Sequence, residues 1–457
     1  MAGKKGCPDT RDFAGANSGR RSVMTFKSST DKLLRTLLGF KNLLVTGHEL
    51  LPRKGVLWLA VKPYKNGACC PHCGRRGKII KRSRKQVARA SRTWRDLPAG
   101  GVATAITYSP REITCETHGR VQEDIPWAAK HSRTTLRFDF QMMRLCKVMT
   151  QKEAAAQLGV PASTLAEMLH RCVGRYREGH KVRGLKKLGI DEISYKRGHR
   201  YLTIVYDLDR SHVVWVGEGK GRKTIDRFFN EVMSAGQRAR VEAACCDMSR
   251  TYIGAIEDHL PKALLVLDRF HVIKALNESV DEVRKEVWRA ASKAERKGLK
   301  GLRFIILKNK KNRTRREHKV MAELTHTQRQ VARACELKDE LSHFWTYSNP
   351  SNAEKFLKAW KKRVKLSRIG PLKKFARTLE AHWDGVMASW TGITNAVAEG
   401  LNRVIRMAKN RASGYLSTDN FANMIYLIAG DLDLPGQIEA INRPRIIKPL
   451  HHQTLCR

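Results

Sequence analysis

Short apolar runs in the middle of the chain alternate with amphipathic segments, and this pattern predicts a mixed α/β sheet. The runs between residues 184 and 216 are most simply interpreted as three antiparallel strands. A helix that begins near Thr224 and a buried strand over residues 241–246 follow. Three strands, a helix and a fourth strand that ends in an acid form a ribonuclease-H-like layout. We therefore predict an α/β protein with a ribonuclease-H-like mixed sheet.

Helical periodicity dominates the second half of the chain. Residues 277–384 are highly charged and helical in pattern, and periodicity resumes at 394–428. One helix of this last segment carries an apolar stripe opposite a polar stripe. The apolar positions are Ile393, Val397, Leu401, Val404, Ile405 and Ala408, and the polar positions are Asn395, Glu399, Asn402, Arg403 and Arg406.

The chain is strongly basic. Its 457 residues contain 88 Lys and Arg against 43 Asp and Glu, a formal net charge of +45. Solubility needs only a modest net charge, whereas a protein that displaces counterions from a phosphate backbone carries a large positive one. We therefore expect nucleic acid as the partner.

The cysteines and the apolar runs indicate a cytoplasmic protein. Eleven cysteines are an odd number, and they are scattered, which favours a reducing compartment. The N-terminus lacks the apolar segment of a signal peptide. No apolar run approaches the roughly 18 residues that span a bilayer, so we expect no membrane partner.

Two pairs of candidate metal ligands occur in the strand-rich segment 56–130. Each pair is separated by two residues and followed by glycine. Such turns aim two ligands at one ion, and two turns complete a closed tetrahedral zinc site. We predict a zinc ribbon with one structural Zn²⁺, although Cys69 or His72 could replace a ligand and the two turns could be unrelated. The four predicted ligands are Cys70, Cys73, Cys115 and His118.

Residues 151–165 have the pattern of a helix-turn-helix. Ala155 supplies a small residue where two helices cross, Gly159 tolerates the turn, and the second helix begins at Ala162 or Ser163. The basic composition favours DNA binding through the second helix, and an ordinary helical hairpin is the alternative. The side chains expected to face a major groove are Ser163, Thr164, Glu167, His170 and Arg171.

Acidic residues follow the apolar strands of the predicted sheet. Asp191 ends the run 184–190 and Asp247 ends the run 241–246, so the layout places them side by side on adjacent strands. Asp268, after the run 263–267, is the main rival of Asp247, because it could bind metal directly or support the ligands. Glu192 should point to the other face of the sheet.

Glu399 is the expected third acid, because a later helix must supply it. A single glutamate among asparagines and arginines suits a group that faces metal and a neighbouring phosphate, and a solvated helix face is the alternative. Carboxylates grouped inside a basic protein suit divalent ions held against a polyanion. The basic residues expected to contact DNA in this region are Arg403, Arg406, Lys409 and Arg411.

Together these motifs resemble a transposase of the insertion-sequence L-three family, from the first cysteine pair to Tyr426. The resemblance implies a DDE catalytic triad at Asp191, Asp247 and Glu399, with a helical insertion before the last acid. The second metal pair, Cys-x-x-His, departs from ribbons that have two cysteines there, but zinc accepts both. The resemblance rests on Cys-Pro-His-Cys-Gly at 70–74, Ile-Pro-Trp at 125–127, Gly-Ile-Asp-Glu at 189–192, Cys-Asp-Met-Ser at 246–249, Asp-Arg-Phe-His at 268–271, Thr-Asn-Ala-Val-Ala-Glu-Gly-Leu-Asn at 394–402 and Lys-Asn-Arg-Ala-Ser-Gly-Tyr at 409–415.

The predicted function is metal-dependent cleavage and strand transfer of double-stranded DNA. We expect two Mg²⁺ or Mn²⁺ ions on Asp191, Asp247 and Glu399, with Asp268 as a further candidate ligand. The ribbon and the helix-turn-helix would bind terminal inverted repeats, and pairing two ends with target DNA would need at least a dimer. The basic run 296–319 either clamps the DNA backbone or is a solvated helix. The alternative function is a catalytically inert, transposase-derived DNA-binding regulator or architectural protein.

These interpretations divide the chain into seven segments. They are an N-terminal arm, partly disordered (1–55), the zinc ribbon (56–130), the helix-turn-helix domain (131–182), the first part of the catalytic core (185–275), the helical insertion (276–385), the last part of the core with Glu399 (386–430) and a basic tail (431–457). The arm and the tail have no clear counterpart in the family.

Overall fold

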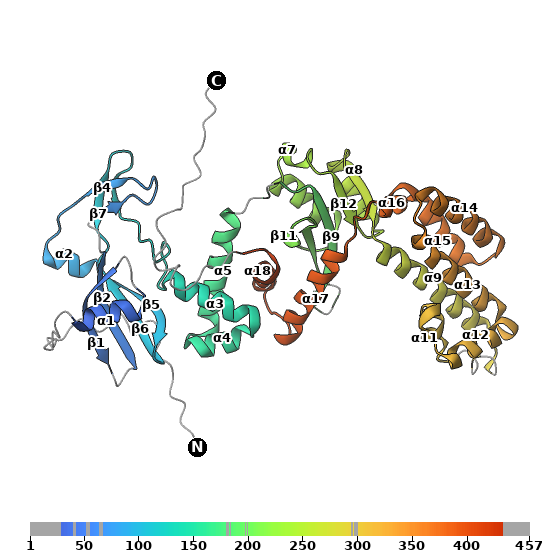
Figure 1. The fold of residues 1–457 in the computed structure, drawn as a ribbon, viewed down its shortest axis with the longest axis horizontal. Helices are drawn as coiled ribbons and strands as arrows, with labels where there is room; N and C mark the ends of the chain where they lie inside the picture. Colours follow the sequence, from blue (N-terminus) through green and yellow to red (C-terminus); the bar gives the residue numbers. More distant parts are fainter. Residues whose placement is uncertain are drawn as a thin grey trace, which may run out of the picture. The chain divides into compact units, whose positions relative to one another are not determined.

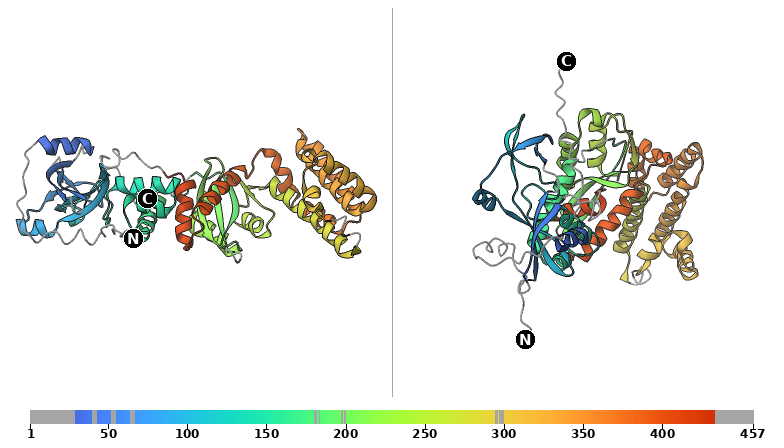
Figure 2. Two further views of the ribbon diagram at one scale, coloured as in Figure 1. Left: turned by 90° about the horizontal axis from the view of Figure 1, so that it is seen from below. Right: turned by 60° about the vertical axis from the view of Figure 1, so that its left-hand side comes forward.

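The computed structural model divides into two compact units, one formed by residues 1–179 with 408–457 and the other by residues 180–407. The boundary falls inside helix α17 (Ala396–Arg411). Figures 1 and 2 show the elements of each unit. The structure describes residues 29–39, 43–51, 55–63, 67–179, 182, 184–196, 198, 200–293, 296 and 300–432.

The first unit begins with two sheets that are interleaved in sequence. A four-stranded sheet has the order β1-β2-β6-β5, and a smaller one has the order β3-β4-β7-β8. We predicted a single zinc ribbon over 56–130, whereas the structure has strands of both sheets in this segment. The strands are β1 (Leu43–Leu51), β2 (Val56–Pro63), β3 (Ala68–Cys69), β4 (Arg76–Ile79), β5 (Arg92–Ala99), β6 (Val102–Tyr108), β7 (Glu112–Cys115) and β8 (Gly119–Gln122), with α1 (Ser29–Leu37) before β1 and α2 (Arg84–Arg89) before β5.

The structure describes only parts of the expected N-terminal arm (1–55) and basic tail (431–457). Residues 29–37 form helix α1, and residues 43–51 form strand β1 of the larger sheet. These residues of the expected arm are therefore folded. Residues 1–28 and 433–457 lie outside the described residues.

Aromatic packing and a buried ion pair support the larger sheet. Trp94 and Trp127 meet edge to face with ring centroids 4.9 Å apart, inside a core closed by apolar side chains of the sheet. The buried Arg137 donates to the buried Asp96, which also accepts from Thr135. Removing one partner of such a pair would leave an uncompensated buried charge.

Helices complete the first unit. These are α3 (Leu136–Val148), α4 (Gln151–Leu158), α5 (Ala162–Gly179) and α18 (Thr418–Ala429). Thr150 and Glu153 form a capping box at the start of α4. The helix ends at Gly159, whose φ of 62° is left-handed and suits glycine because it has no Cβ. The turn therefore reverses the chain into α5, as the sequence predicts.

The second unit contains the predicted mixed sheet, with strand order β11-β10-β9-β12-β13. The first three strands are antiparallel, and β12 runs parallel to both β9 and β13. The strands are β9 (Lys187–Lys196), β10 (Arg200–Asp207), β11 (His212–Glu218), β12 (Ala243–Cys246) and β13 (Leu264–Leu267). They are connected by α6 (Arg222–Arg227), a π-helical turn (Phe228–Val232), α7 (Ala235–Arg238) and α8 (Arg250–His259).

The two faces of this sheet are covered differently. Leu188, Ile190 and Cys246 pack with aromatic and aliphatic side chains of the α6 and α8 region. On the opposite face, Cys245 and Val266 pack with residues near the start of α17. Because side chains alternate along a strand, the residues two positions beyond Gly189, Cys245 and Val266 belong to the α17 face.

The segment that the sequence predicts as a helical insertion is helical throughout its described elements. Its interior includes the fully buried Trp360, Phe344 and Leu357. Among the described residues, no helix has the length and apolar character needed to cross a membrane. The helices are α9 (Arg269–Ala290), α11 (Leu302–Leu307), α12 (Arg315–Thr327), α13 (Arg329–Leu341), α14 (Pro350–Leu366), α15 (Gly370–Ala381) and α16 (Trp383–Met387).

Candidate functional site

Three acidic residues belong to three neighbouring strands of the mixed sheet: Asp191 lies within β9, and Asp247 and Asp268 come directly after β12 and β13. Cys245 on β12 is paired with Gly189 on β9, so two further residues along this register bring Asp247 beside Asp191. Cys246 is paired with Leu267 on β13, so Asp268 follows at the same level. All three belong to the face on which α17 lies.

Both oxygens of Asp191 are held by hydrogen bonds. The backbone N–H of Glu192 donates to Oδ1 over 2.7 Å, and the side-chain amide of Asn402 on α17 donates to Oδ2 over 2.6 Å. The hydroxyl of the fully buried Tyr206 donates in turn to Asn402 Oδ1. This relay fixes which way the Asn402 amide points, and therefore fixes the Asp191 carboxylate.

The start of α17 lies directly on the sheet. Asn395 is buried, and a Cβ added at Gly189 would lie 2.5 Å from its side-chain oxygen. Only glycine at position 189 therefore permits this approach. Asn395 and Asn402 are two helical turns apart, and they fasten the same side of α17 to the strand that carries Asp191.

The buried side of α17 matches the predicted apolar stripe only in part. Asn395 and Asn402 are buried together with Ala398 and Ile405, whereas Val404 of the predicted apolar stripe is 45% exposed. The prediction was wrong in part, because the two asparagines find hydrogen-bond partners in the sheet and are buried despite their polarity.

Glu399 lies between these two asparagines in sequence and is itself exposed. It shares a cavity of about 440 Å³ with Asp268, and its negative charge contributes to the raised pKa of Asp268. Glu399 on α17 therefore lies near Asp268, on the side of the sheet that α17 covers.

The candidate acids are partly buried, and their negative charges repel one another. Burial is the main cause that raises the pKa of Asp191, and the charge of Asp247 raises it further. Burial likewise raises the pKa of Asp268, whose Oδ2 is buried without a hydrogen bond from the described residues. His271 Nε2 lies 3.8 Å from that oxygen. An orphaned carboxylate oxygen among like charges fits a divalent cation, which would supply the missing partner.

The ligand oxygens of the candidate acids are not close enough to one another for three acids to share an ion. In the part of the chain that the structure describes, no three of them have ligand oxygens all within 4.8 Å. Side-chain rotation is therefore needed before one ion could touch Asp191, Asp247 and Glu399 together. Glu192 is half-buried, and burial raises the pKa of its carboxyl group as well.

A second group of metal-ligating atoms lies in the small sheet of the first unit. Cys70, Cys73, Cys115 and His118 have ligand atoms within 4.8 Å of one another. Neighbouring atoms are 3.5 Å apart for Cys73 Sγ and Cys115 Sγ, and 3.7 Å apart for either Cys70 or Cys115 Sγ and His118 Nδ1.

This spacing suits a tetrahedral ion. Zinc bonds of about 2.3 Å to sulfur and 2.0–2.1 Å to nitrogen separate tetrahedral ligands by roughly 3.6–3.8 Å. The hydrogen bond with His118 is the main cause that lowers the pKa of the Cys115 thiol to about 6, so this sulfur is ready to bind metal near neutral pH. Neither Cys69 nor His72 belongs to the group, although His72 stacks on His118 at 5.1 Å.

Some of the predicted DNA-contacting side chains of the helix-turn-helix are exposed, and one of them makes a hydrogen bond within the protein. On α5, Ser163, Glu167 and Arg171 are exposed and Thr164 is half-buried. His170 shares a hydrogen bond with Asn423 of α18 over 3.0 Å, a contact that the sequence pattern did not indicate.

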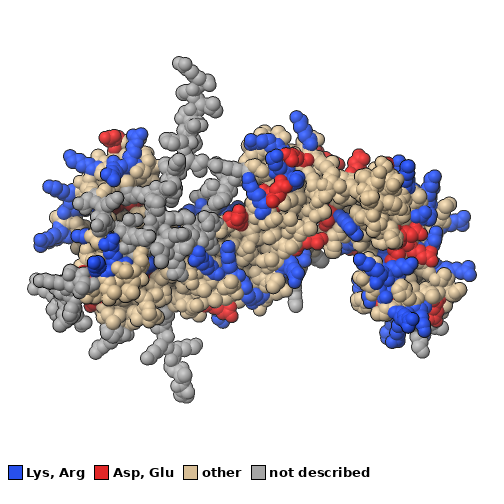
Figure 3. All heavy atoms as spheres, in the orientation of Figure 1, with Lys and Arg blue, Asp and Glu red and all other residues tan. Residues whose placement is uncertain are grey.

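The basic residues of α17 differ in the same way. Arg403 and Arg406 are exposed, and Lys409 is half-buried. Arg411 donates to the carbonyl of Lys147. Farther along the second unit, basic side chains gather around α11 and α12 (Figure 3), where Lys310, Lys311, Arg315, Arg316 and Lys319 are exposed.

Comparison with known proteins decides the family. A family model described as a transposase matches residues 188–425, which include all the candidate acids. A second model, the helix-turn-helix domain of transposase family ISL3, matches residues 123–173. The chain belongs to transposase family ISL3. The DDE transposases of this family use divalent metal ions, cleave DNA and transfer its strands, so family membership favours the enzyme over an inert regulator.

Named relatives agree with this membership. The chain is 28% identical over 399 residues to the transposase for insertion sequence element IS1001 of Bordetella parapertussis, covering 85% of this chain and 96% of that protein. It is 26% identical over 404 residues to the transposase for IS1557 of Mycobacterium tuberculosis, covering 82% and 89%.

Among solved structures, the Drosophila P element transposase strand transfer complex matches with a TM-score of 0.32 and 12% identity, over 65% of this chain and 92% of that one. A TM-score this low is no basis for assigning a shared fold.

Proposed function

We propose that this ISL3 transposase cuts and joins DNA with Asp191, Asp247 and Glu399 as a DDE triad on a ribonuclease-H-like core. The register that aligns Asp191, Asp247 and Asp268 on the α17 face carries the proposal. The core comprises 185–275 and 386–430, and the helical insertion 276–385 separates the second and third acids.

Two divalent ions, Mg²⁺ or Mn²⁺, would activate the attacking oxygen and stabilise the leaving oxygen when bound. Asp191 is the acid best placed to contact both ions, because hydrogen bonds from Glu192 and Asn402 orient both of its carboxylate oxygens. Asp247 and Glu399 complete the ligand set. Asp268, with His271 beside it, either joins this set or holds it in place.

The same proposal assigns DNA binding to four surfaces. The zinc ribbon, with one Zn²⁺ on Cys70, Cys73, Cys115 and His118, and the exposed side of α5 bind terminal inverted repeats. The exposed Arg403 and Arg406 contact phosphates close to the acids. The basic side chains around α11 and α12 clamp the DNA backbone, as the charge of the run 296–319 suggests. Pairing two ends requires at least a dimer.

Cleavage of end-containing DNA tests this assignment. The substrate is the DNA that flanks the coding region, where the proposal places the terminal inverted repeats. Asp247→Asn and Glu399→Gln should each abolish Mg²⁺-dependent cutting. Asp258→Asn is the matched control, because Asp258 is exposed and its ion pair among the described residues is with Arg222. If the Asp247→Asn protein cuts at the parent rate, the triad is misassigned.

A further inference from the structure

Phe270 is an exposed aromatic residue immediately beside the candidate acids. It is the second residue of α9, two positions after Asp268, and 56% of it is exposed. Its described ring contact is an edge contact with His271, with centroids 5.5 Å apart. By contrast, five phenylalanines elsewhere in the described chain are completely buried, namely Phe138, Phe228, Phe229, Phe344 and Phe421.

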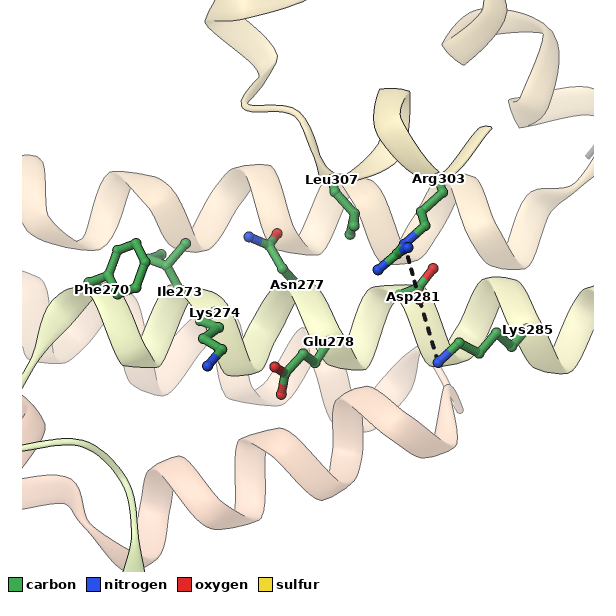
Figure 4. A pocket seen from close by; sticks show the side chains of 9 residues that line it. All are labelled: Phe270, Ile273, Lys274, Asn277, Glu278, Asp281, Lys285, Arg303 and Leu307. Carbon is green, nitrogen blue, oxygen red and sulfur yellow. Dashed lines mark ion pairs between the residues drawn. The ribbon is translucent and has the colours of Figure 1, made fainter. Parts of the chain in front are cut away.

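Two cavities of the second unit meet at Phe270. One, of about 440 Å³, extends from Asp268 and Glu399 toward Lys338. The other, of about 330 Å³, continues along α9 to Asp281 and Arg303 (Figure 4). Both volumes are within the range of small-molecule sites. The cavities share Phe270, Ile273, Asn277 and Leu307, and we call the space around these four residues the α9 groove.

The α9 groove is built for a flat, neutral, hydrogen-bonding group. Ile273 and Leu307 give it apolar walls beside the Phe270 ring. The half-buried Asn277 side chain makes no hydrogen bond with the described residues, so its amide is available as both donor and acceptor. In Figure 4 this amide lies between the aromatic end of the groove and Arg303.

Acidic and basic side chains line the two cavities in equal number. The acidic ones are Asp268, Glu278, Asp281, Asp339 and Glu399, and the basic ones are Arg269, Lys274, Lys285, Arg303 and Lys338, so no net positive charge favours a phosphate. Asp281 is already paired with Arg284, Lys285 and Arg303. A nucleobase meets the apolar and amide surfaces without bringing a negative charge toward these acids.

We propose that the α9 groove holds one unpaired nucleobase of the DNA next to the bond that is cut, stacked on Phe270 and hydrogen-bonded by Asn277. The inference rests on the proposed function, because only DNA bound at the acids brings a base to this position. A base inside a duplex is unreachable until it leaves the stack, and an aromatic platform favours that exit.

Fluorescence of 2-aminopurine, placed in turn at each position around the cut site, reads the base directly. One position should brighten when the protein binds in Ca²⁺, because the base leaves its stack. Phe270→Ala should abolish this change, Phe270→Trp should keep it, and Phe304→Ala should leave it intact. Phe304 is a matched control, because it is 78% exposed in the same unit but lines neither cavity. A brightening that survives Phe270→Ala, or none at any position, would overturn the proposal.

Cutting gives an independent readout. Phe270→Ala should slow Mg²⁺-dependent cleavage of intact duplex by about 5- to 150-fold, the worth of one stacked base. An abasic site at the brightened position should remove most of the difference between this variant and the parent. Equal rates on intact duplex would contradict the base site.

The two proposals can fail separately. The Asp247→Asn protein should still produce the fluorescence change although it does not cut. If it cuts like the parent while Phe270→Ala loses the fluorescence change, the triad fails and the base site stands.

Discussion

Asn402 is the residue outside the acids for which the structure predicts the largest effect on the rate of DNA cleavage. Its amide donates to Asp191 Oδ2 over 2.6 Å and accepts from the buried Tyr206 hydroxyl. Asn402→Ala removes both bonds at once. Among the described residues, the Glu192 N–H is then the remaining hydrogen-bond partner of the Asp191 carboxylate, which is free to rotate away from the other acids.

The size of the effect follows from the type of bond that is lost. A hydrogen bond to a charged group contributes about 1.5–3 kcal/mol. If that energy serves to hold Asp191 in place, cleavage should slow by about 10- to 150-fold. The stranded Tyr206 hydroxyl should also lower the free energy of unfolding by about 1–3 kcal/mol.

A double-mutant cycle separates these two effects. Tyr206→Phe removes the hydroxyl but leaves the donor to Asp191, so it should change the cleavage rate less than Asn402→Ala does. In urea unfolding, the Tyr206→Phe/Asn402→Ala protein should lose about 1 kcal/mol less than the sum of the single variants. Strict additivity, together with an unchanged cleavage rate in Asn402→Ala, would refute the relay.

Three further predictions concern other parts of the molecule. Cys115→Ser should lower the zinc content measured by atomic emission and weaken binding to end DNA, whereas His118→Cys should retain zinc. If the purified parent protein contains no zinc, the ribbon site is contradicted. Burial raises the pKa of Asp268, so its ionised form costs stability above its unfolded pKa, and Asp268→Asn should raise the unfolding temperature of metal-free protein at pH 7. That gain should vanish as the pH falls to about 4, where the parent carboxyl is protonated, and a gain that persists there would have another cause. Arg137→Ala should lower the free energy of unfolding of the first unit by about 3–5 kcal/mol in urea, because it strands the buried Asp96; a loss below about 1 kcal/mol would mean that water reaches this carboxylate.

The sheet of the second unit was predictable because its signal is local. Each apolar run ends in its acid, and period-two alternation then fixes the face on which Asp191 lies. The side of α17 that faces the sheet was not predictable in the same way. Burial of Asn395 and Asn402 depends on the Ile190 carbonyl and the Tyr206 hydroxyl, which are about 200 residues away in sequence.

The larger sheet of the first unit was missed for a related reason. Its strand β2 pairs with β6 in parallel, and strands β3 and β4 of the smaller sheet lie between them in sequence. Cysteine spacing predicted that Cys70, Cys73, Cys115 and His118 lie together, as they do in the structure, but no spacing in the sequence indicates that two strands pair across an intervening element. The α9 groove likewise depends on how the helices pack, so the sequence identified Asp268 and His271 without indicating what the exposed Phe270 faces.

Anomalous diffraction from crystals grown with Mn²⁺ tests the central claim most directly. The account predicts two manganese peaks roughly 3.5–4 Å apart, with Asp191 between them and with Asp247 and Glu399 each touching one. Manganese bound by Asp268 in place of Asp247, or a Glu399 side chain directed away from both peaks, would contradict the proposed triad.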